Sequence, residues 1–343
     1  MATTRRTFLT TLAGAPLAVA LPVRRAGAQA RAKVTLIQTF PSMAFAAVYA
    51  ARAQSYFDQE GVDVEVQIVS GDAIGAQALV GRTAPMAAIG GAEAVLLAQK
   101  GIKDFISVAS VISAISVSVC VRKDIAEARR LTPSMPIEQR LAGLKGLKIA
   151  TGSPGGAIHT TVRYLLGRAG LDPKTDVSLL TVAGGPAMLA GLKAKQFDAI
   201  AISPPAPEMA EVDGAGTLVI SLSRGDVPEL GNLPYDVLLV HRDYVANNRD
   251  TVRRVARALG RGAKVMRENP GLAKESLLKY FDKTPPAVMD AVVNNLRTAF
   301  NGDGKQSVEM WKNLLQFTAK AKNEPVALDP AEGVLWTNEF IGT

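Results

Sequence analysis

The sequence predicts an α/β protein of two lobes, joined by two strands that pass between them. Two successive stretches, residues 33–112 and 147–221, each repeat a short apolar strand, a small-residue turn and a helical pattern. Repeats of this kind form right-handed parallel βαβ units, and the length suits two domains. The fold class is therefore α/β, with two Rossmann-like lobes and a double-strand hinge.

The first stretch begins with an apolar strand over residues 34–37. Apolar residues at helical spacing follow from Met43 to Phe57, and Gly61 ends that helix. Apolar and polar residues then alternate from Val62 to Val69, which predicts a strand. The further elements expected here are a helix to about Val80, a strand over 86–89, a helix over 92–99 and a strand over 105–112.

The second stretch is entered through a strand over residues 117–121, followed by a polar segment over 123–140. A strand over 235–241 could run back alongside residues 117–122. The other expected elements are strands over 147–150, 177–182, 199–202 and 217–221, helices over 157–169 and 187–195, and later helices over 248–268, 272–280, 286–300 and 306–321. This order assigns residues 31–114 and 242–343 to the first lobe and residues 115–241 to the second.

Residues 1–30 have the pattern of an export signal rather than of a fold element. A twin arginine (Arg5, Arg6) precedes an apolar run from Leu12 to Leu21, and the segment closes with small residues before Ala30. The run is too short to span a membrane. The arginine pair favours the twin-arginine route, with the general secretory route and a disordered basic tail as alternatives. We expect cleavage near Ala30 and a periplasmic protein.

Composition excludes several classes of function. The formal charge of +8 falls to +4 when the four arginines of the signal are removed, and no basic cluster is interleaved with aromatic residues, which argues against nucleic-acid binding. Cys120 has no partner for a disulfide and lies in an alternating strand, so we expect a small buried hydrophobe. It also lies far from the signal, so no lipoprotein anchor is expected. One cysteine and two histidines cannot form a His/Cys zinc site, and no metal or cofactor is expected.

Small-residue turns follow nearly every predicted strand. In open α/β sheets ligands bind beyond the carboxyl ends of the strands, where backbone N–H groups at helix N-termini are free. Any one turn is explained by tight chain reversal alone, but five turns at corresponding places favour a ligand site. The glycines from Gly152 to Gly156 have neither dinucleotide-binding nor P-loop spacing. The turns are 39–42, 70–72, 90–91, 152–156 and 184–185.

Three polar residues in or just after these turns have two interpretations each. His159 lies in the first turn of a predicted helix, where it could contact a ligand or face solvent, and no nucleophile stands near it in the sequence. Glu93 and Asp72 could read a donor group on a ligand. They could equally provide favourable negative charge at a helix N-terminus.

Ordered stretches over most of residues 33–210 resemble the periplasmic solute-binding proteins of ABC importers for nitrate, sulfonates, taurine and thiamin-pyrimidine precursors. The order of the stretches is specific to this group, whereas each stretch alone is a weak signal. The matching stretches are 48–57, 60–65, 88–91, 119–124, 144–150, 155–159, 169–173 and 196–200.

The resemblance implies a two-lobed, type II-like binding protein. It would be a monomer that closes on a small anionic or aromatic molecule and hands it to an ABC permease in the inner membrane. This chain lacks the hydroxyl residues that the group often has at Gly156 and Ala157, and has Ser203 where an aromatic often stands. Both changes remove bulk and predict a ligand larger than taurine or nitrate. The candidate ligand contacts are Thr39, Phe40, Pro41, Ser42, Met43, Gly71, Gly91, Ala92, Ser113, Gly156, Ala157, His159 and Ser203.

Two other functions remain open at this point. One is an enzyme of the thiamin-pyrimidine-synthase type on the same fold, which relies on a cysteine-rich motif that a single cysteine cannot supply. The other is the sensing module of a signalling system, but no predicted DNA-binding or membrane-spanning segment supports it. The sequence leaves the identity of the ligand undetermined.

Overall fold

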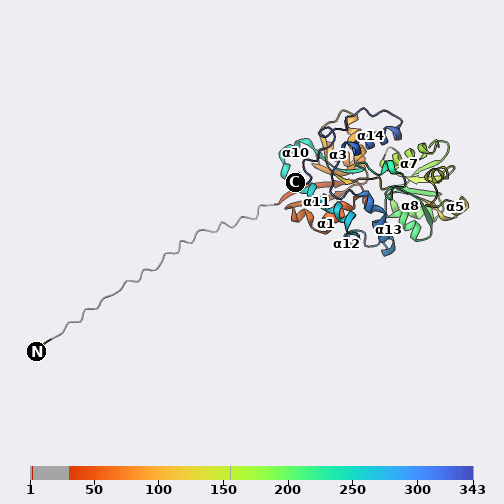
Figure 1. Cartoon of the computed structure of the whole chain (residues 1–343), viewed down its shortest axis with the longest axis horizontal. Coiled ribbons are helices and arrows are strands. Elements are labelled where there is room, and N and C mark those ends of the chain that lie inside the picture. The colour runs from red at the N-terminus through yellow and green to blue at the C-terminus, as the bar shows by residue number, and fades with distance from the viewer. Residues whose placement is uncertain (1, 3–30, 155, 343) are drawn as a thin grey trace. The chain divides into compact units, whose positions relative to one another are not determined.

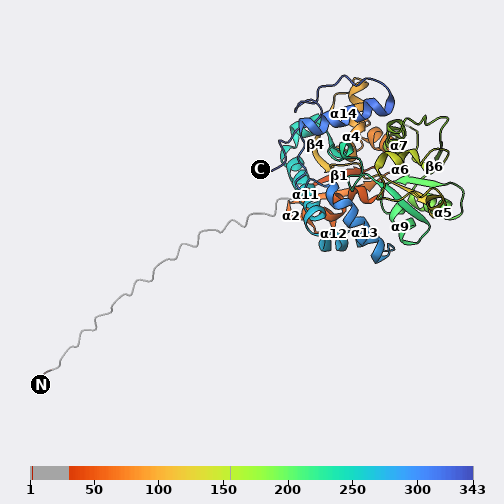
Figure 2. The ribbon, with the colours of Figure 1, turned by 45° about the vertical axis from the view of Figure 1, so that its right-hand side comes forward.

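Two mixed β-sheets of five strands each organise the chain from Ala32 onwards. The structure is a computed structural model that describes residue 2, residues 31–154 and residues 156–342. The predicted export signal, apart from Ala2, lies outside the described residues, as does Gly155 of the predicted turn 152–156. Figures 1 and 2 show the arrangement from two sides.

The first sheet has the strand order β2-β1-β3-β10-β4. β1 is parallel to β2 and β3, whereas β10 runs antiparallel between β3 and β4. Every residue of β3, β4 and β10 is buried, as expected for strands with both faces covered. The strands are β1 (Ala32–Gln38), β2 (Val62–Ile68), β3 (Met86–Gly90), β4 (Phe105–Ile112) and β10 (Asp236–His241).

The second sheet has the equivalent order β7-β6-β8-β5-β9. β6 is parallel to β7 and β8, and β5 is antiparallel to β8 and β9. Cys120 of β5 is fully buried, which confirms its expected role as a small core residue. The strands are β5 (Ser118–Arg122), β6 (Lys148–Thr151), β7 (Ser178–Thr181), β8 (Ala199–Ile202) and β9 (Gly216–Ser221).

The predicted pairing of strand 235–241 with residues 117–122 is wrong. β10 pairs with β3 and β4 of the first sheet, with His241 opposite Phe105. Its four central residues are apolar and fully buried, and they match the equally apolar faces of β3 and β4. The lobe boundaries stay a prediction, but the place of β10 favours ending the second lobe before Asp236.

Two connections link the sheets, residues 113–117 after β4 and residues 222–235 after β9. They run beside each other, because the Leu222 N–H donates to the Val117 carbonyl (3.1 Å) and the Leu233 N–H to the Ser113 carbonyl (3.0 Å). This pair of connections forms the expected double hinge between the two sheets.

Helices cover the sheets, and their bounds follow the predicted pattern with two differences. The single helix expected over 43–57 is divided, because Ser55 adopts a left-handed φ of 54°. Four short helices, α5, α6, α9 and α10 (Arg242–Asn247), lie in segments for which no helix was predicted. Around the sheets lie α1 (Ala46–Ala53), α2 (Tyr56–Gln59), α3 (Asp72–Val80), α4 (Gly91–Gln99), α5 (Lys123–Ala128), α6 (Ile137–Ala142), α7 (Ala157–Arg168), α8 (Gly185–Lys193) and α9 (Ala206–Val212), with 3₁₀ turns at Met43–Phe45, Pro228–Leu230 and Arg297–Ala299.

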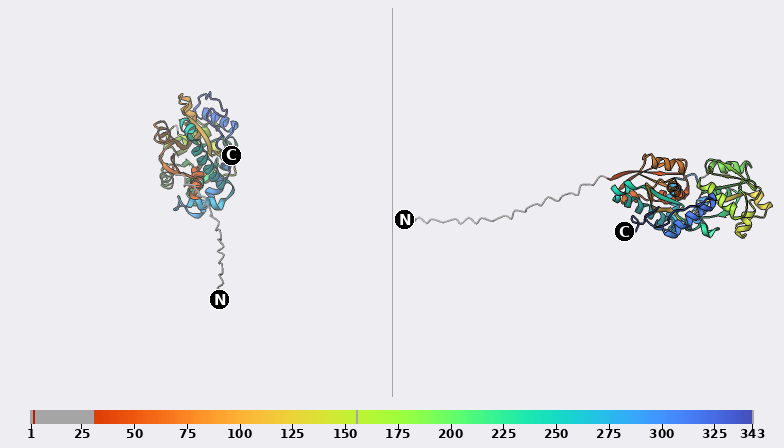
Figure 3. Two further views of the ribbon diagram at one scale, coloured as in Figure 1. Left: turned by 90° about the vertical axis from the view of Figure 1, so that its left-hand side faces the viewer. Right: turned by 90° about the horizontal axis from the view of Figure 1, so that it is seen from above.

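The C-terminal helices pack mainly against the first sheet, but two of them also reach the second half. Gly262 of α11 lies so close to α1 that an added Cβ would stand 2.1 Å from the Ala47 carbonyl oxygen. Figure 3, seen from above, shows the late helices in blue between the two ends of the molecule. These helices are α10 (Arg242–Asn247), α11 (Arg249–Glu268), α12 (Pro270–Leu278), α13 (Pro286–Leu296) and α14 (Val308–Lys322). Among the described residues, no helix has the length and apolarity that a membrane span requires.

Candidate functional site

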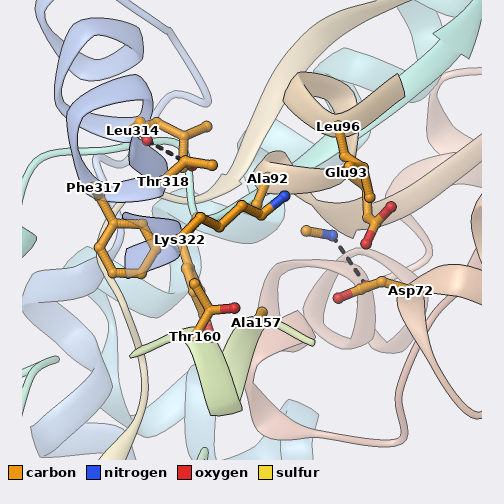
Figure 4. Close-up of a pocket in the computed structure, with 12 residues that line it drawn as sticks. Asp72, Ala92, Glu93, Leu96, Ala157, Thr160, Leu314, Phe317, Thr318 and Lys322 are labelled. Carbon is orange, nitrogen blue, oxygen red and sulfur yellow. Dashed lines mark hydrogen bonds between the residues drawn. The ribbon is translucent and has the colours of Figure 1, made fainter. Parts of the chain in front are cut away.

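A cavity lies where the two halves of the molecule and α14 meet (Figure 4). The first half contributes the starts of α3 and α4 and the end of the second hinge connection. The second half contributes the first turn of α7. The lining residues are Asp72, Gly90, Ala92, Glu93, Leu96, Ala157, Thr160, Tyr235, Leu314, Phe317, Thr318 and Lys322.

Strand–helix junctions create this site, as expected for an open α/β sheet. β3 ends at Gly90 and α4 begins at the next residue, so Ala92 and Glu93 stand in the first helical turn. On the other side α7 begins at Ala157. Ala92 and Ala157 thus face the same cavity from two halves of the chain (Figure 4).

Asp72 is the most enclosed carboxyl group of the cavity lining. It is the first residue of α3, and its Oδ1 accepts a hydrogen bond from the Gly90 N–H at 3.2 Å. Burial raises the pKa of this carboxyl above its ordinary value, although the Thr39 side chain and the Gly90 N–H offset part of the effect. The hydrogen bond from Gly90 therefore connects the turn before α3, which ends at Asp72, to the junction between β3 and α4 at Gly90.

Two further carboxyl groups lie within electrostatic range of Asp72. Burial and the charge of Asp72 both raise the pKa of Glu93, while Lys322 and Lys100 act in the opposite direction. Asp236, at the start of β10, is only 5% exposed, and burial together with Asp72 raises its pKa well above the ordinary value. Like charges that share a buried region disfavour joint ionisation.

Helix α14 supplies the fourth side of the cavity. Lys322, in its last turn, reaches across toward Glu93 (Figure 4). Phe317 packs against Tyr164 of α7, with ring centroids 5.3 Å apart. The chain therefore bridges the two halves at the cavity through a helix that belongs to neither βαβ series.

The cavity is small, with a volume of about 20 Å³. A space of this size suits about one water molecule. An organic ligand can enter only if the two halves separate or the side chains of α14 move. In this arrangement the cavity therefore has no room for an organic ligand.

The predicted ligand contacts in the turn after β1, residues 39–43, touch the second half of the molecule at a place away from the cavity. The Ser42 hydroxyl and the Met43 N–H both donate to the Pro204 carbonyl at 3.4 Å. Thr39 is fully buried, Phe40 is half-buried and Pro41 is exposed. None of these five residues lines the cavity of Figure 4, although they form a contact between the halves.

Three predicted glycine contacts use their N–H groups within the backbone. The Gly71 N–H donates to the Thr39 carbonyl (2.8 Å), the Gly91 N–H to the Tyr235 carbonyl (2.7 Å) and the Gly156 N–H to the Ser153 carbonyl (3.0 Å). These amides hold the walls of the site in place.

Two predicted serines belong to the hinge region. The hydroxyl of Ser203 lies 2.8 Å from that of Ser116, in the first hinge connection. Ser113 starts that connection, and its N–H donates to the Ala299 carbonyl at 2.7 Å. Both serines lie outside the cavity lining.

His159 points away from the cavity. It lines a second, more open pocket with Arg163 and Lys174, between α7 and the edge strand β7. Burial and the nearby Arg163 lower the pKa of His159. Because 157 and 160 share one face of α7 while 159 and 163 share another, helical periodicity alone separates His159 from the cavity.

Nothing in the described part of the chain is arranged for metal binding. Within residues 31–154 and 156–342, no group of three or more His, Cys, Asp or Glu side chains could hold a metal ion. The four α14 residues, Tyr235, Leu96 and Thr160 were not predicted as part of the site. No local pattern shows that α14 and the segment before β10 return to the turns.

Comparison with known proteins places this architecture among binding proteins. The model of the NMT1-like family matches residues 13–277. The binding protein YtlA of Bacillus subtilis is 20% identical over 85% of this chain and 84% of its own length. A protein of Brachyspira hyodysenteriae, named as an ABC transporter periplasmic binding protein, is 32% identical over 41% of this chain and 38% of its own length.

The fold is that of type II periplasmic binding proteins. The alkanesulfonate-binding protein SsuA from Xanthomonas axonopodis, solved with MOPS bound, superposes with a TM-score of 0.66 at 17% identity. The match covers 87% of this chain and 96% of that protein. At this identity the likeness establishes the fold and not the ligand.

Proposed function

Since the chain belongs to the NMT1-like family, we propose that it is the substrate-binding protein of an ABC importer. It captures a small organic solute between its two lobes and hands it to a permease in the inner membrane. The main observation behind this proposal is the cavity. It is bounded by the first turn of α4, which follows a strand of the first sheet, and by the first turn of α7, which follows a strand of the second sheet. Its relatives named as binding proteins support the same function.

The hinge supports capture by closure. In the part of the chain that the structure describes, residues 113–117 and 222–235 are the two connections between the sheets, so a change confined to these segments can separate the lobes. A ligand favours the closed form only if it makes additional contacts there. Ala92 and Ala157 lie on opposite walls, so a bound solute would touch both lobes at once.

The remaining sequence expectations fit this function as parts of the proposal. They include export to the periplasm through the signal at 1–30, action as a monomer, and further ligand contacts in the open form from the β1 turn, Gly71, Gly91, Ser113, Gly156, His159 and Ser203. We favour binding over catalysis, because Cys120 is fully buried in β5 and burial raises the pKa of its thiol.

A thermal-shift screen of the purified protein tests the proposal. The compounds are sulfonates, aromatic carboxylates, nitrate, pyrimidines and amines. A ligand at 100 times its dissociation constant adds about 2.7 kcal/mol to the free energy of unfolding, so a clear rise in Tm is expected for one class. Ala92→Leu would fill the cavity and abolish that rise, whereas Ala190→Leu on the exposed face of α8 would leave it unchanged. Hydrolysis or another conversion of the bound compound would contradict a pure binding function.

A further inference from the structure

The second pocket, which His159 lines, lies within the second half of the molecule and apart from the cavity of Figure 4. Residues between 159 and 179 form it from α7, the loop after α7 and the edge strand β7, so it exists whether the lobes are open or closed. Its volume of about 450 Å³ falls within the range of sites for small organic ligands. The lining residues are His159, Arg163, Pro173, Lys174, Val177, Ser178 and Leu179.

The pocket carries positive charge without a counter-charge of its own. Its lining includes Arg163 and Lys174, which are cationic at neutral pH, and no acidic residue. Neither of these side chains forms an ion pair or a hydrogen bond with any residue that the structure describes. His159 precedes Arg163 by one turn on the same face of α7, so the polar groups of both side chains border one space.

The acidic residues of the adjoining loop are engaged elsewhere. The Asp176 carboxyl group pairs with Lys145 at 3.2 Å and accepts a hydrogen bond from the Asp172 N–H at 2.9 Å. The Asp172 carboxyl group accepts a hydrogen bond from the backbone N–H of Lys174 at 2.8 Å, which leaves the ammonium group of that lysine free. The loop therefore does not neutralise the charge in the pocket.

Two nitrogen atoms at this pocket are buried without a hydrogen-bond partner among the described residues. They are the Nδ1 of His159 and the Nε of Arg163. Buried polar atoms are almost always paired in native proteins, so two orphaned atoms on neighbouring turns of one helix require an explanation. The other nitrogens of these two side chains have no protein acceptor either, so both groups can donate to a bound molecule without giving up an existing hydrogen bond.

We propose that this pocket binds a small organic dianion, such as a dicarboxylate or a phosphate monoester, through Arg163, Lys174 and His159. A guanidinium group forms paired hydrogen bonds to an oxyanion and an ammonium group adds a second charge, so a doubly charged ligand balances both. Burial and Arg163 lower the pKa of His159, which therefore contributes an uncharged N–H donor at pH 7. The inference is independent of the proposed function, because none of these residues lines the cavity between the lobes.

NMR of the histidine side chains tests the inference at the site itself. The sequence contains 2 histidines, and His241, buried at the end of β10 in the first sheet, is an internal control. Protein without a histidine tag is titrated with ethane-1,2-disulfonate, whose charges do not titrate near neutral pH. A bound dianion favours the imidazolium form, so the protonation equilibrium of His159 should shift about fivefold towards the charged form at saturation. That of His241 should not move.

Matched variants separate a built site from general screening by salt. Arg163→Gln and Lys174→Gln should each weaken binding about tenfold or more, as read from the His159 resonance. Lys174 is exposed, so its variant keeps the test valid if Arg163→Gln impairs folding. Lys123→Gln removes the same charge from α5, which packs at the opposite edge of the second sheet, and should leave binding unchanged.

Three results would overturn the inference and leave the proposed function untouched. The first is an unmoved His159 resonance at disulfonate concentrations up to about 10 mM, which would saturate a millimolar site. The second is an equal response in all three variants, or the same response to sodium chloride at equal ionic strength. The third is a response to sulfate but not to the disulfonate, which would show an adventitious ion only.

Discussion

Replacement of Glu208 by glutamine should make the protein more stable at alkaline pH and leave it little changed at acid pH. Glu208 lies in α9, fully buried between the two halves. Its Oε1 accepts a hydrogen bond from the Asn295 side chain of α13 at 3.3 Å, and its Oε2 has no partner in the described structure. Burial raises its pKa from 4.5 to about 7, with Glu211 adding to the rise and Arg224 opposing it.

The sign follows from proton binding. The folded state holds the proton more tightly than the unfolded chain, so the contribution of Glu208 to stability is most favourable below pH 4.5. It is lost as the pH rises from 4.5 through 7. A shift of this size corresponds to about 3 kcal/mol at most, because each pKa unit is worth about 1.4 kcal/mol. Glutamine does not titrate and retains the oxygen that Asn295 contacts.

Urea denaturation of both proteins at several pH values between 4.5 and 8 measures the effect. The free energy of unfolding of Glu208→Gln relative to the wild type should increase by about 3 kcal/mol across this range. Effects of other titrating groups cancel in that difference, and Glu127→Gln at an exposed site provides a flat control profile. Parallel profiles for Glu208→Gln and the wild type would refute the reasoning.

Two further changes test the packing. Gly262→Ala should destabilise the protein by about 1–3 kcal/mol or more, because the added Cβ meets the Ala47 carbonyl oxygen at 2.1 Å. Gly167→Ala, in α7 with open space around it, should stabilise by about 0.5–1 kcal/mol. A similar effect of both on the urea midpoint would contradict this contrast. Asp226→Ala should cost about 3–5 kcal/mol, because it leaves the buried Arg140 guanidinium without its 2.8 Å partner. A free energy of unfolding equal to that of the wild type would show that this pair contributes nothing.

The sequence by itself determined the local elements and their kind. Apolar alternation in 62–69 and unbroken apolar runs such as 105–112 mark strands at the places where β2 and β4 occur. These patterns arise from burial of one or both faces of a strand, which depends on neighbouring residues and is visible locally. The short helices α5, α6, α9 and α10 were not predicted, because helices of six or seven residues bury little of a continuous apolar face.

The sequence also located part of the candidate site. Turns after strands identified Ala92 and Ala157, and left Asp72 and Glu93 with two interpretations, all four of which line the cavity. Their shared position follows from a general rule, since helices that start at the carboxyl ends of strands meet at one edge of a sheet, whereas their contact with a ligand stays a prediction. His159 lies on another face of α7 and lines the second pocket, so its contact with a ligand stays a prediction.

Only the tertiary structure decided which distant segments meet. β10 carries the apolar pattern of any buried strand, so its insertion between β3 and β4 depends on pairing partners more than 120 residues away in the chain. Lys322 and Phe317 likewise reach the site through the packing of α14 against α7, which no local period encodes. Local patterns report burial, whereas the charge and the closure of a site result from contacts between residues that the sequence keeps far apart.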